Sequence, residues 1–150
     1  MATTITNATL TVTIKEDISL NNSQQGASNS FTIASINEVA KRIITVEDAT
    51  NGTEIYKGGA AAGAGQFISE KVKYIRITNL DNTNYVILHF EGSSHYSQHK
   101  LEAGKSFILP TPVGFDNNAD IDNFSSETIT SIQAKATSTD IDLEVFVASI

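Results

Sequence analysis

The sequence contains no cysteine, no tryptophan, only two prolines and few basic side chains, and these shortages exclude several classes of protein. Without cysteine there are no disulfides, no thiolate nucleophiles and no zinc sites built on sulfur. Ten Lys and Arg stand against 17 Asp and Glu, and the resulting charge of -7 disfavours nucleic acid and anionic membranes as partners. No apolar run approaches the roughly 18 residues of a membrane span, and residues 1–13 do not resemble a signal peptide. We therefore expect synthesis in the cytoplasm without secretion.

Length and composition predict one folded domain over residues 1–150, with residues 1–8 as a candidate N-terminal arm. Hydrophobic residues make up 40% of the 150 and charged residues 18%, which suits a packed core. Acidic charge is concentrated at the end of the chain. Residues 101–150 hold two basic and eight acidic side chains, a net charge of -6, which leaves -1 for the first hundred. This pattern predicts a solvated acidic face, and a docking site for a basic partner is the alternative.

Alternation of apolar and polar residues predicts β-strands along most of the chain. In Thr9–Lys15 the alternation places Leu10, Val12 and Ile14 on one face of a strand. We expect this segment to be the first strand of the domain's own sandwich, and an arm that pairs with the sheet edge of a neighbouring molecule is the alternative. The expected strands, about nine in number, are 9–15, 31–33, 42–47, 54–57, 72–78, 85–90, 106–109, 128–136 and 141–147.

The last of these strands carries the clearest pattern. Leu143 and Val145 should face the core, whereas Asp142 and Glu144 should face solvent. One segment, 33–43, also has apolar residues at helical spacing, and we expect at most one short helix there.

Turn residues separate the expected strands. The pair Asn51-Gly52 predicts a hairpin between the strands on either side of it. Residues 79–84 and 101–105 are predicted to be turns as well. The polar stretch 21–30 is expected to be a flexible loop. Together these features predict an all-β fold, a single-domain antiparallel β-sandwich of jelly-roll type, or else a small barrel.

The small-residue segment Gly58–Gly65 does not have the composition of a phosphate-binding loop. A P-loop needs Lys followed by Ser or Thr after its last glycine, and here Gln66 and Phe67 follow. A dinucleotide loop needs a third glycine and a helix behind it, and neither is predicted. We expect a mobile loop or a close approach of two backbones.

All three histidines, His89, His95 and His99, fall within eleven residues. On a strand, His95 and His99 would share a face but lie roughly 13 Å apart, which is too far to chelate one metal ion. A surface cluster is therefore the favoured interpretation, and a metal site formed by a loop is the alternative.

The acidic stretch Asp116-Asn117-Asn118-Ala119-Asp120-Ile121-Asp122, with Glu127 following, has the oxygen-ligand spacing of a calcium loop. The position that needs glycine for a left-handed turn is occupied by the β-branched Ile121, and no flanking helices are predicted. We therefore predict a solvated loop that does not bind calcium. A calcium site is the alternative.

No catalytic motif is present. The sequence lacks Gly-x-Ser-x-Gly and His-Glu-x-x-His, and it has no acidic residue isolated within an apolar run. We predict that the protein is not an enzyme, with no catalytic residue, cofactor or metal ligand.

Three consecutive segments resemble a known family. They are KYIRITNLD at 73–81, YVILHFEG at 85–92 and KLEAGKSFIL at 100–109, and the final segment IDLEVFVAS at 141–149 is similar in style. The four segments comprise 36 of the 150 residues. They resemble small all-β virion structural proteins of tailed bacteriophages, particularly marine cyanophages.

The resemblance implies a structural role without an active site. It points to a capsid decoration or cement protein that binds the assembled capsid lattice within the virion, with assembly in the host cytoplasm. The implied partners are the major capsid protein or other virion proteins, and a homodimer or homotrimer is expected. A tail or tail-adaptor component is the close alternative.

Two further classes remain open from the residues alone. A carbohydrate-binding β-sandwich presents exposed aromatic rings, but tryptophan is absent and the tyrosines Tyr56, Tyr74, Tyr85 and Tyr96 lie mostly within expected strands. An enzyme of the cupin type would need a histidine-rich metal set spread over several strands.

Overall fold

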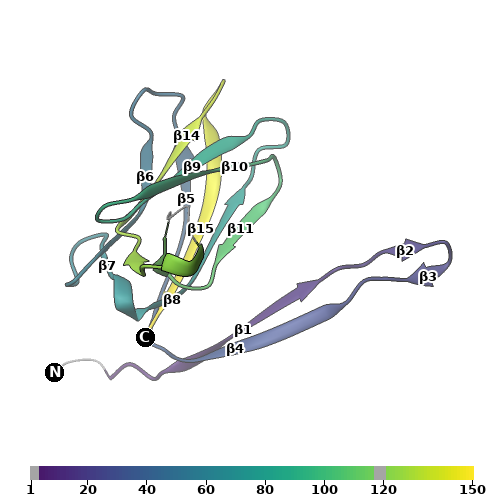
Figure 1. Ribbon diagram of the computed structural model, residues 1–150, viewed down its shortest axis with the longest axis horizontal. Coiled ribbons are helices and arrows are strands. Elements are labelled where there is room, and N and C mark those ends of the chain that lie inside the picture. The colour runs from purple at the N-terminus through teal and green to yellow at the C-terminus, as the bar shows by residue number, and fades with distance from the viewer. Residues whose placement is uncertain (1–3, 117–120) are drawn as a thin grey trace. The chain divides into compact units, whose positions relative to one another are not determined.

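Strands form along most of the chain, as the alternation of apolar and polar residues predicts (Figure 1). The computed structural model describes residues 4–116 and 121–150. Helical structure in these residues is confined to two single turns of 3-10 helix, η1 (Ser69–Lys71) and η2 (Ile121–Asn123). The protein is therefore all-β, as predicted.

The chain divides into two compact units, Met1–Asn37 and Glu38–Ile150. The first unit is a long two-stranded hairpin with a further short strand pair at its tip. Its strands are β1 (Ala8–Lys15), β2 (Ser19–Leu20), β3 (Ser23–Gln24) and β4 (Ser28–Ile36). Asn21 and Asn22 form the two-residue turn between β2 and β3 with φ of 51° and 62°, the left-handed values that such turns require.

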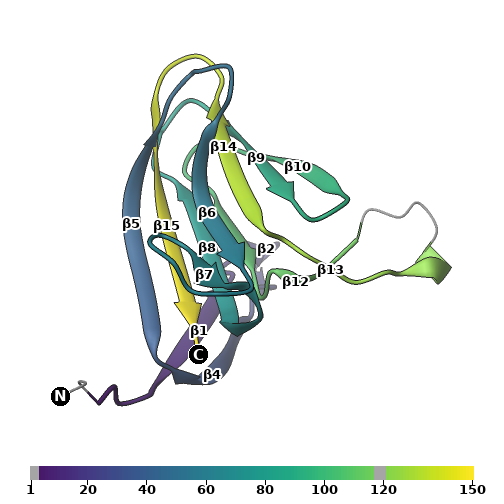
Figure 2. The ribbon, with the colours of Figure 1, turned by 90° about the vertical axis from the view of Figure 1, so that its left-hand side faces the viewer.

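The second unit contains two larger sheets that form two layers (Figure 2). One sheet has the order β10-β9-β14-β6-β7 and the other the order β11-β8-β15-β5, while β12 and β13 form a separate pair. The strands are β5 (Glu38–Val46), β6 (Thr53–Gly59), β7 (Phe67–Ile68), β8 (Val72–Asn79), β9 (Val86–Glu91), β10 (Tyr96–Leu101), β11 (Ser106–Leu109), β12 (Val113–Phe115), β13 (Glu127–Thr128), β14 (Ser131–Ala136) and β15 (Ile141–Ser149).

The eight longer strands of this unit pair in a nested order. The first, β5, pairs with the last, β15, and the second, β6, pairs with the seventh, β14. The third, β8, pairs with the sixth, β11, and the fourth, β9, pairs with the fifth, β10. Among these eight strands, only β9 is followed by a strand of its own sheet, β10, and every other step along the chain crosses to the opposite sheet.

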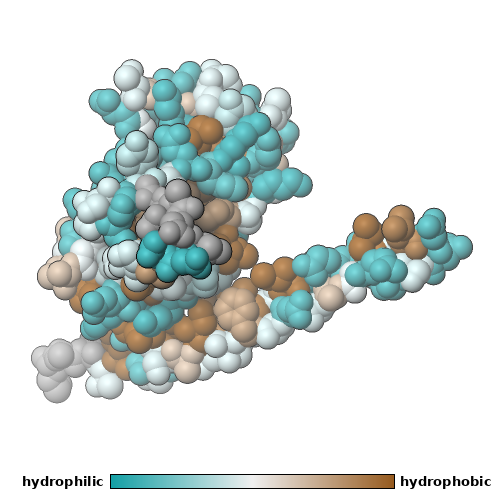
Figure 3. Space-filling view, in the orientation of Figure 1, coloured by the Kyte–Doolittle hydropathy of each residue, from teal (hydrophilic) through white to brown (hydrophobic). Residues whose placement is uncertain are grey.

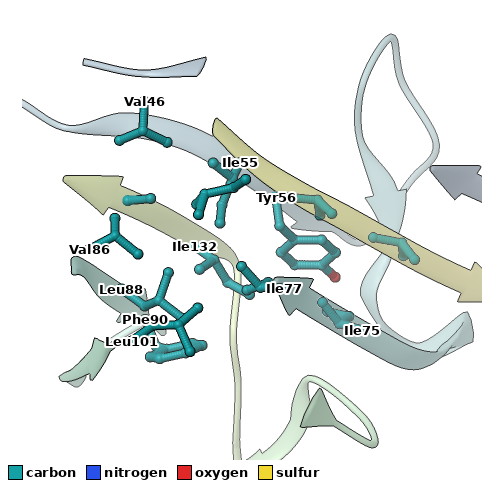
Figure 4. Packing of buried hydrophobic residues seen from close by; sticks show 14 of the residues in the cluster. Val46, Ile55, Tyr56, Ile75, Ile77, Val86, Leu88, Phe90, Leu101 and Ile132 are labelled. Carbon is teal, nitrogen blue, oxygen red and sulfur yellow. The ribbon is translucent and has the colours of Figure 1, made fainter. Parts of the chain in front are cut away.

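The hydrophobic core lies between the two sheets (Figure 4). Ile75 and Ile77 of β8 and Leu143 of β15 enter it from one sheet, while Leu88 of β9 and Ile132 of β14 enter it from the other. All five side chains are fully buried. Burial of a side chain of this size stabilises the fold by about 1.5–3 kcal/mol, so this cluster holds the two sheets together.

Alternation along β15 follows the prediction for its inward side chains, but Glu144 departs from it. Leu143 and Val145 are buried, and Asp142 is exposed. Glu144 faces away from the core, but its side chain is only 17% exposed because its carboxylate lies 2.5 Å from Arg76 Nη2 and 3.0 Å from Lys41 Nζ. These two cations hold the pKa of Glu144 below its usual value, Lys41 contributing most.

Segment 33–43 lies in strands β4 and β5, because each strand gains a pairing partner, and this agrees with the expectation of at most one short helix there. Two other local predictions are wrong. Asn51-Gly52 does form a turn, with Gly52 at a φ of 66°, but it joins strands of different sheets and so makes no hairpin. The predicted flexible loop 21–30 instead contains β3 and the start of β4.

The strand over 9–15 was expected within the sandwich, and this is also wrong. In the described part of the chain β1 pairs only with β4, in a sheet of its own. Strand β10 was not predicted at all, because its sequence Tyr-Ser-Gln-His-Lys-Leu is largely polar. It lies at the edge of its sheet, where fewer side chains need to be apolar.

Candidate functional site

The hairpin of the first unit has one apolar and one polar face. Leu10 and Val12 of β1 lie opposite Ile33 and Phe31 of β4, and side chains that face each other across an antiparallel pair share a side of the sheet. Ile14 lies on the same side. We call this two-stranded segment, residues 8–15 and 28–36, the ribbon, and these five side chains its apolar face.

The opposite face of the ribbon carries mainly hydroxyl groups. Thr11 lies opposite Thr32, and Thr13 lies opposite Ser30 with the two side-chain oxygens 2.8 Å apart. The only charged side chain on either strand is Lys15, at the end of β1. This ribbon therefore offers apolar contact on one side and hydroxyl groups on the other.

Several apolar side chains of the first unit are exposed, whereas Val12 on the apolar face and Ile36 are buried. Ile14 and Phe31 are each 41% exposed, and Ile18 and Leu20 near the tip are 54% and 60% exposed. Figure 3 shows hydrophobic surface, in brown, at several places along the hairpin. A two-stranded hairpin is marginally stable by itself in water, and exposed apolar patches of this kind mark interaction surfaces.

The three histidines lie in different surroundings. His89 is on the outer face of the sheet containing β9, and its ring lies 5.6 Å from that of Tyr96. The ring of His99 lies 5.0 Å from that of Phe107, on the other face of the same sheet. His95 lies in the turn before β10, where Nδ1 is 3.1 Å from a carboxylate oxygen of Glu127. No group of three or more His, Asp or Glu side chains suited to a metal ion occurs among residues 4–116 and 121–150.

Glu127 fastens the turn between β9 and β10. Its Oε1 accepts hydrogen bonds from the Ser93 hydroxyl and from the Ser94 N–H at 2.6 Å, and its Oε2 accepts one from His95 Nδ1. The Ser93 hydroxyl is the main cause of a lowered pKa for Glu127. A Cβ at Gly92 would lie 2.5 Å from Oε2, so this position needs glycine for the carboxylate to approach.

A serine, a histidine and a carboxylate thus meet, but they do not form a catalytic triad. In a triad the histidine stands between the serine hydroxyl and the acid, and takes the serine's proton. Here Ser93 and His95 both donate to Glu127 directly. The arrangement therefore ties the β9–β10 turn to β13 and does not activate a nucleophile.

The predicted calcium loop is only partly within the described residues, since Asn117, Asn118, Ala119 and Asp120 lie outside them. At its start, Asp116 Oδ2 accepts a hydrogen bond from Ser125 N at 2.6 Å. At its end, both oxygens of Glu127 accept hydrogen bonds from the β9–β10 turn. Bidentate binding of calcium by Glu127 would therefore compete with the two donors on Oε1.

The segment Gly58–Gly65 brings backbones together, which was one of the two predicted outcomes. Gly58 and Gly59 end β6 and pair in parallel with β7. A Cβ at Gly58 would collide with the Ser69 hydroxyl. Strand β7 follows the segment where a nucleotide-binding loop would require a helix.

The polar side chains of the segment NLDN at 79–82 form hydrogen bonds within the turn between β8 and β9. The buried Asn79 side chain donates to the carbonyls of Asn84 and Leu101 and accepts from Asp81 N. Asp81 in turn accepts from the N–H groups of Thr83 and Asn84, and these bonds lower its pKa. Sequence reasoning missed Asn79, although its position in a turn favours an asparagine that bonds local backbone. These polar residues therefore stabilise the link between β8 and β9.

The outer face of the sheet containing β9, β10 and β14 has a shallow groove of about 420 Å³. Its lining residues are Thr50, Asn51, Gly52, Ile87, His89, Gln98, Gln133, Ala134 and Lys135. Tyr96, which is 66% exposed, lies beside it against His89. Of the other tyrosines, Tyr56 and Tyr74 are buried, and the Tyr85 ring lies under Lys100 Nζ at 4.1 Å.

Comparison of the chain with protein-family models, with curated proteins and with solved structures finds no match. Within the described ranges, no helix has the length and apolar character needed to cross a membrane.

Proposed function

We propose that this protein is a structural component of a bacteriophage virion, a decoration or cement protein that binds the assembled capsid lattice. The observation that carries the proposal is the ribbon. Its apolar face exposes Ile14 and Phe31, and the hairpin has too few strands to bury them within one sheet. A lattice of coat subunits offers the extended surface that such a face needs.

The strand order supports a jelly-roll fold for the second unit, and we include that topology in the proposal. The nested pairing of β5 with β15, β6 with β14, β8 with β11 and β9 with β10 is the pattern of two interlocked Greek keys. Jelly rolls are common in viral capsid proteins and in lectins. A fold of this type therefore favours a binding or structural role.

Charge suggests how the protein meets its partner. The second unit carries the acidic residues 101–150, and a basic surface on the capsid would accelerate its approach. The ribbon strands carry little charge, so their contact would be largely insensitive to salt. We therefore propose that the acidic side chains raise the association rate and that the apolar face provides most of the final affinity.

A matched pair of variants tests the ribbon. Phe31→Asp places a charge on the apolar face, and Thr32→Asp places the same charge on the hydroxyl face one residue away. We expect Phe31→Asp to abolish binding to particles that lack the protein, because an unpaired carboxylate buried in the contact is costly. Thr32→Asp should leave the affinity for these particles within about threefold of the wild-type value. Equal occupancy by the two variants, measured by sedimentation with the particles, would contradict the role of the ribbon.

A comparison of assembled heads with free coat subunits tests whether binding requires the lattice. Several weak contacts made together act at high effective concentration, so we expect nearly full occupancy on heads and negligible binding to free subunits. Raising salt from about 50 to about 500 mM should slow binding while leaving final occupancy largely intact. Heads without the protein should assemble but lose their genome more readily on heating.

The tail or tail-adaptor component remains the competing proposal. Deletion that gives heat-stable heads without tails, or without infectivity, would favour it over decoration. Sedimentation of the isolated protein as a dimer or trimer would support the expected homo-oligomer, since most soluble oligomers are symmetric assemblies of this kind.

A further inference from the structure

The groove on the outer face of β9, β10 and β14 has side chains arranged in rows across the strands. Gln98 of β10 and Gln133 of β14 both lie opposite His89 of β9, so an imidazole stands between two amides. Gln98 Nε2 and His89 Nδ1 are 3.3 Å apart. In the next row, Ile87 lies between Lys100 and Lys135.

The turn Thr50-Asn51-Gly52 borders the groove beside β14. A Cβ at Gly52 would lie 3.2 Å from the carbonyl oxygen of Ala134, so glycine lets this turn approach the strand closely. Asn51 is exposed and adds a third amide to the two glutamines. The polar groups come from three strands and one tight turn, and strands hold side chains in more defined positions than long loops do.

This set of groups is suited to a ligand rich in hydroxyl groups. An amide both donates and accepts hydrogen bonds, as a sugar hydroxyl does, and imidazole can do either through each nitrogen. Tyr96, exposed and tilted by 31° against the His89 ring, offers an aromatic face beside the groove. Ile87 supplies apolar contact between the polar groups. A shallow site with a few placed polar groups and an aromatic face matches the alternating polar and apolar surfaces of a sugar ring.

The charge of the groove is unlike that of the protein as a whole. The chain carries -7, yet none of the groove's lining residues is acidic and one of them is Lys135. Within the described ranges Lys135 makes no ion pair, whereas Lys100 of the same row lies 2.7 Å from a carboxylate oxygen of Glu102. Lys135 is therefore available to a carboxylate on a ligand.

We propose that this groove binds a saccharide, and that Lys135 favours one carrying a uronic acid. Asn51, Gln98 and Gln133 bond its hydroxyl groups, and Tyr96 packs against a ring face. The proposal does not depend on the capsid role, because the ribbon and this groove belong to different units of the chain.

The probes are a linear tetrasaccharide of galacturonic acid and its neutral galactose counterpart, each titrated into the full-length protein by NMR and by calorimetry. We expect saturable binding of both, with Kd of about 1 mM or tighter for the uronate and a preference for it of about fivefold. Lys135→Gln should remove that preference and leave the neutral sugar unaffected. Lys105→Gln, in the turn before β11, is the matched control and should change neither affinity.

Two variants test the contacts. Gln133→Ala should weaken both sugars by about tenfold, since it leaves ligand hydroxyls unpaired. Tyr96→Ala should weaken both by a similar factor, and because this side chain is exposed the variant should retain the wild-type melting temperature. Gln25→Ala, in the first unit, serves as the amide control.

Three results would overturn the proposal. The first is no saturable binding of either sugar up to about 10 mM, which is about tenfold above the expected Kd for the uronate. The second is equal binding of a short polyglutamate peptide, which would show attraction of charge alone. The third is unchanged affinity in both Gln133→Ala and Tyr96→Ala, which would place any binding elsewhere.

Discussion

Replacing Leu143 by alanine tests the position of β15 between β8 and β5. Leu143 is fully buried in the cluster formed by both sheets. The substitution removes its burial energy and leaves a cavity, because the neighbouring strands hold the surrounding side chains in place. We expect a loss of about 3 kcal/mol in the free energy of unfolding, within the range of 2–5 kcal/mol found for such changes.

Tyrosine fluorescence is the suitable probe of unfolding for this variant. All four tyrosines lie in the second unit, and the sequence has no tryptophan. Tyrosine fluorescence during urea unfolding therefore reports on that unit alone. A loss of about 3 kcal/mol corresponds to a fall of roughly 10 °C in Tm for a unit of this size.

Neighbouring substitutions on the opposite face provide the controls. Asp142→Asn changes an exposed side chain and should cost about 0.5 kcal/mol or less. Glu144→Gln weakens the contacts with Arg76 and Lys41, and should cost about 1 kcal/mol because Lys41 is largely exposed. If Leu143→Ala and Asp142→Asn had the same urea midpoint, the assignment of the two faces of β15 would be refuted.

Three further predictions concern the acidic loop and the hydrogen bonds by which Glu127 holds the β9–β10 turn, which we call the turn clamp. Because hydrogen bonds lower the pKa of Glu127 in the folded state, its contribution to stability is present above the unfolded value of about 4.3 and is lost as pH falls through the folded value. Urea midpoints should therefore fall below about pH 4.5 and fall less steeply in Glu127→Gln; an identical pH profile would exclude this role. Gly92→Ala should lower Tm by roughly 5 °C, because the new Cβ forces Glu127 away from the β9–β10 turn. Gly63→Ala should leave Tm unchanged, since its Cβ would meet only Gln66 Cβ at 3.6 Å. Equal Tm values for the two variants would contradict the role of Glu127 in holding the turn. Tm in millimolar calcium and Tm in chelator should agree to within about 1 °C. A calcium site saturated 100-fold would add about 2.7 kcal/mol to the free energy of unfolding. A large rise in Tm that Asp120→Ala abolishes would reveal such a site.

The functional surfaces were only partly predictable from sequence. The alternation in Thr9–Lys15 identifies Leu10, Val12 and Ile14 as one face, and the structure confirms that they share it with β4. Nothing in the sequence indicates that this strand pairs outside the two larger sheets. The groove was not predicted because Gln98 and Gln133 are 35 residues apart and become neighbours only across β9.

Sequence by itself determined the all-β class, the inward face of β15 and the turn at Asn51-Gly52, because alternation and turn conformation depend on residues within a few positions of each other. Only the tertiary structure decided which strands pair. Asn51-Gly52 forms its turn in either case, but β5 continues into the opposite sheet because its partner is β15, about a hundred residues away. Likewise the polar β10 is a strand because β9 supplies hydrogen bonds to its backbone, and Glu127 became a clamp because two distant segments meet. Backbone pairing between remote segments leaves no local pattern in the sequence, which is why these features required the structure.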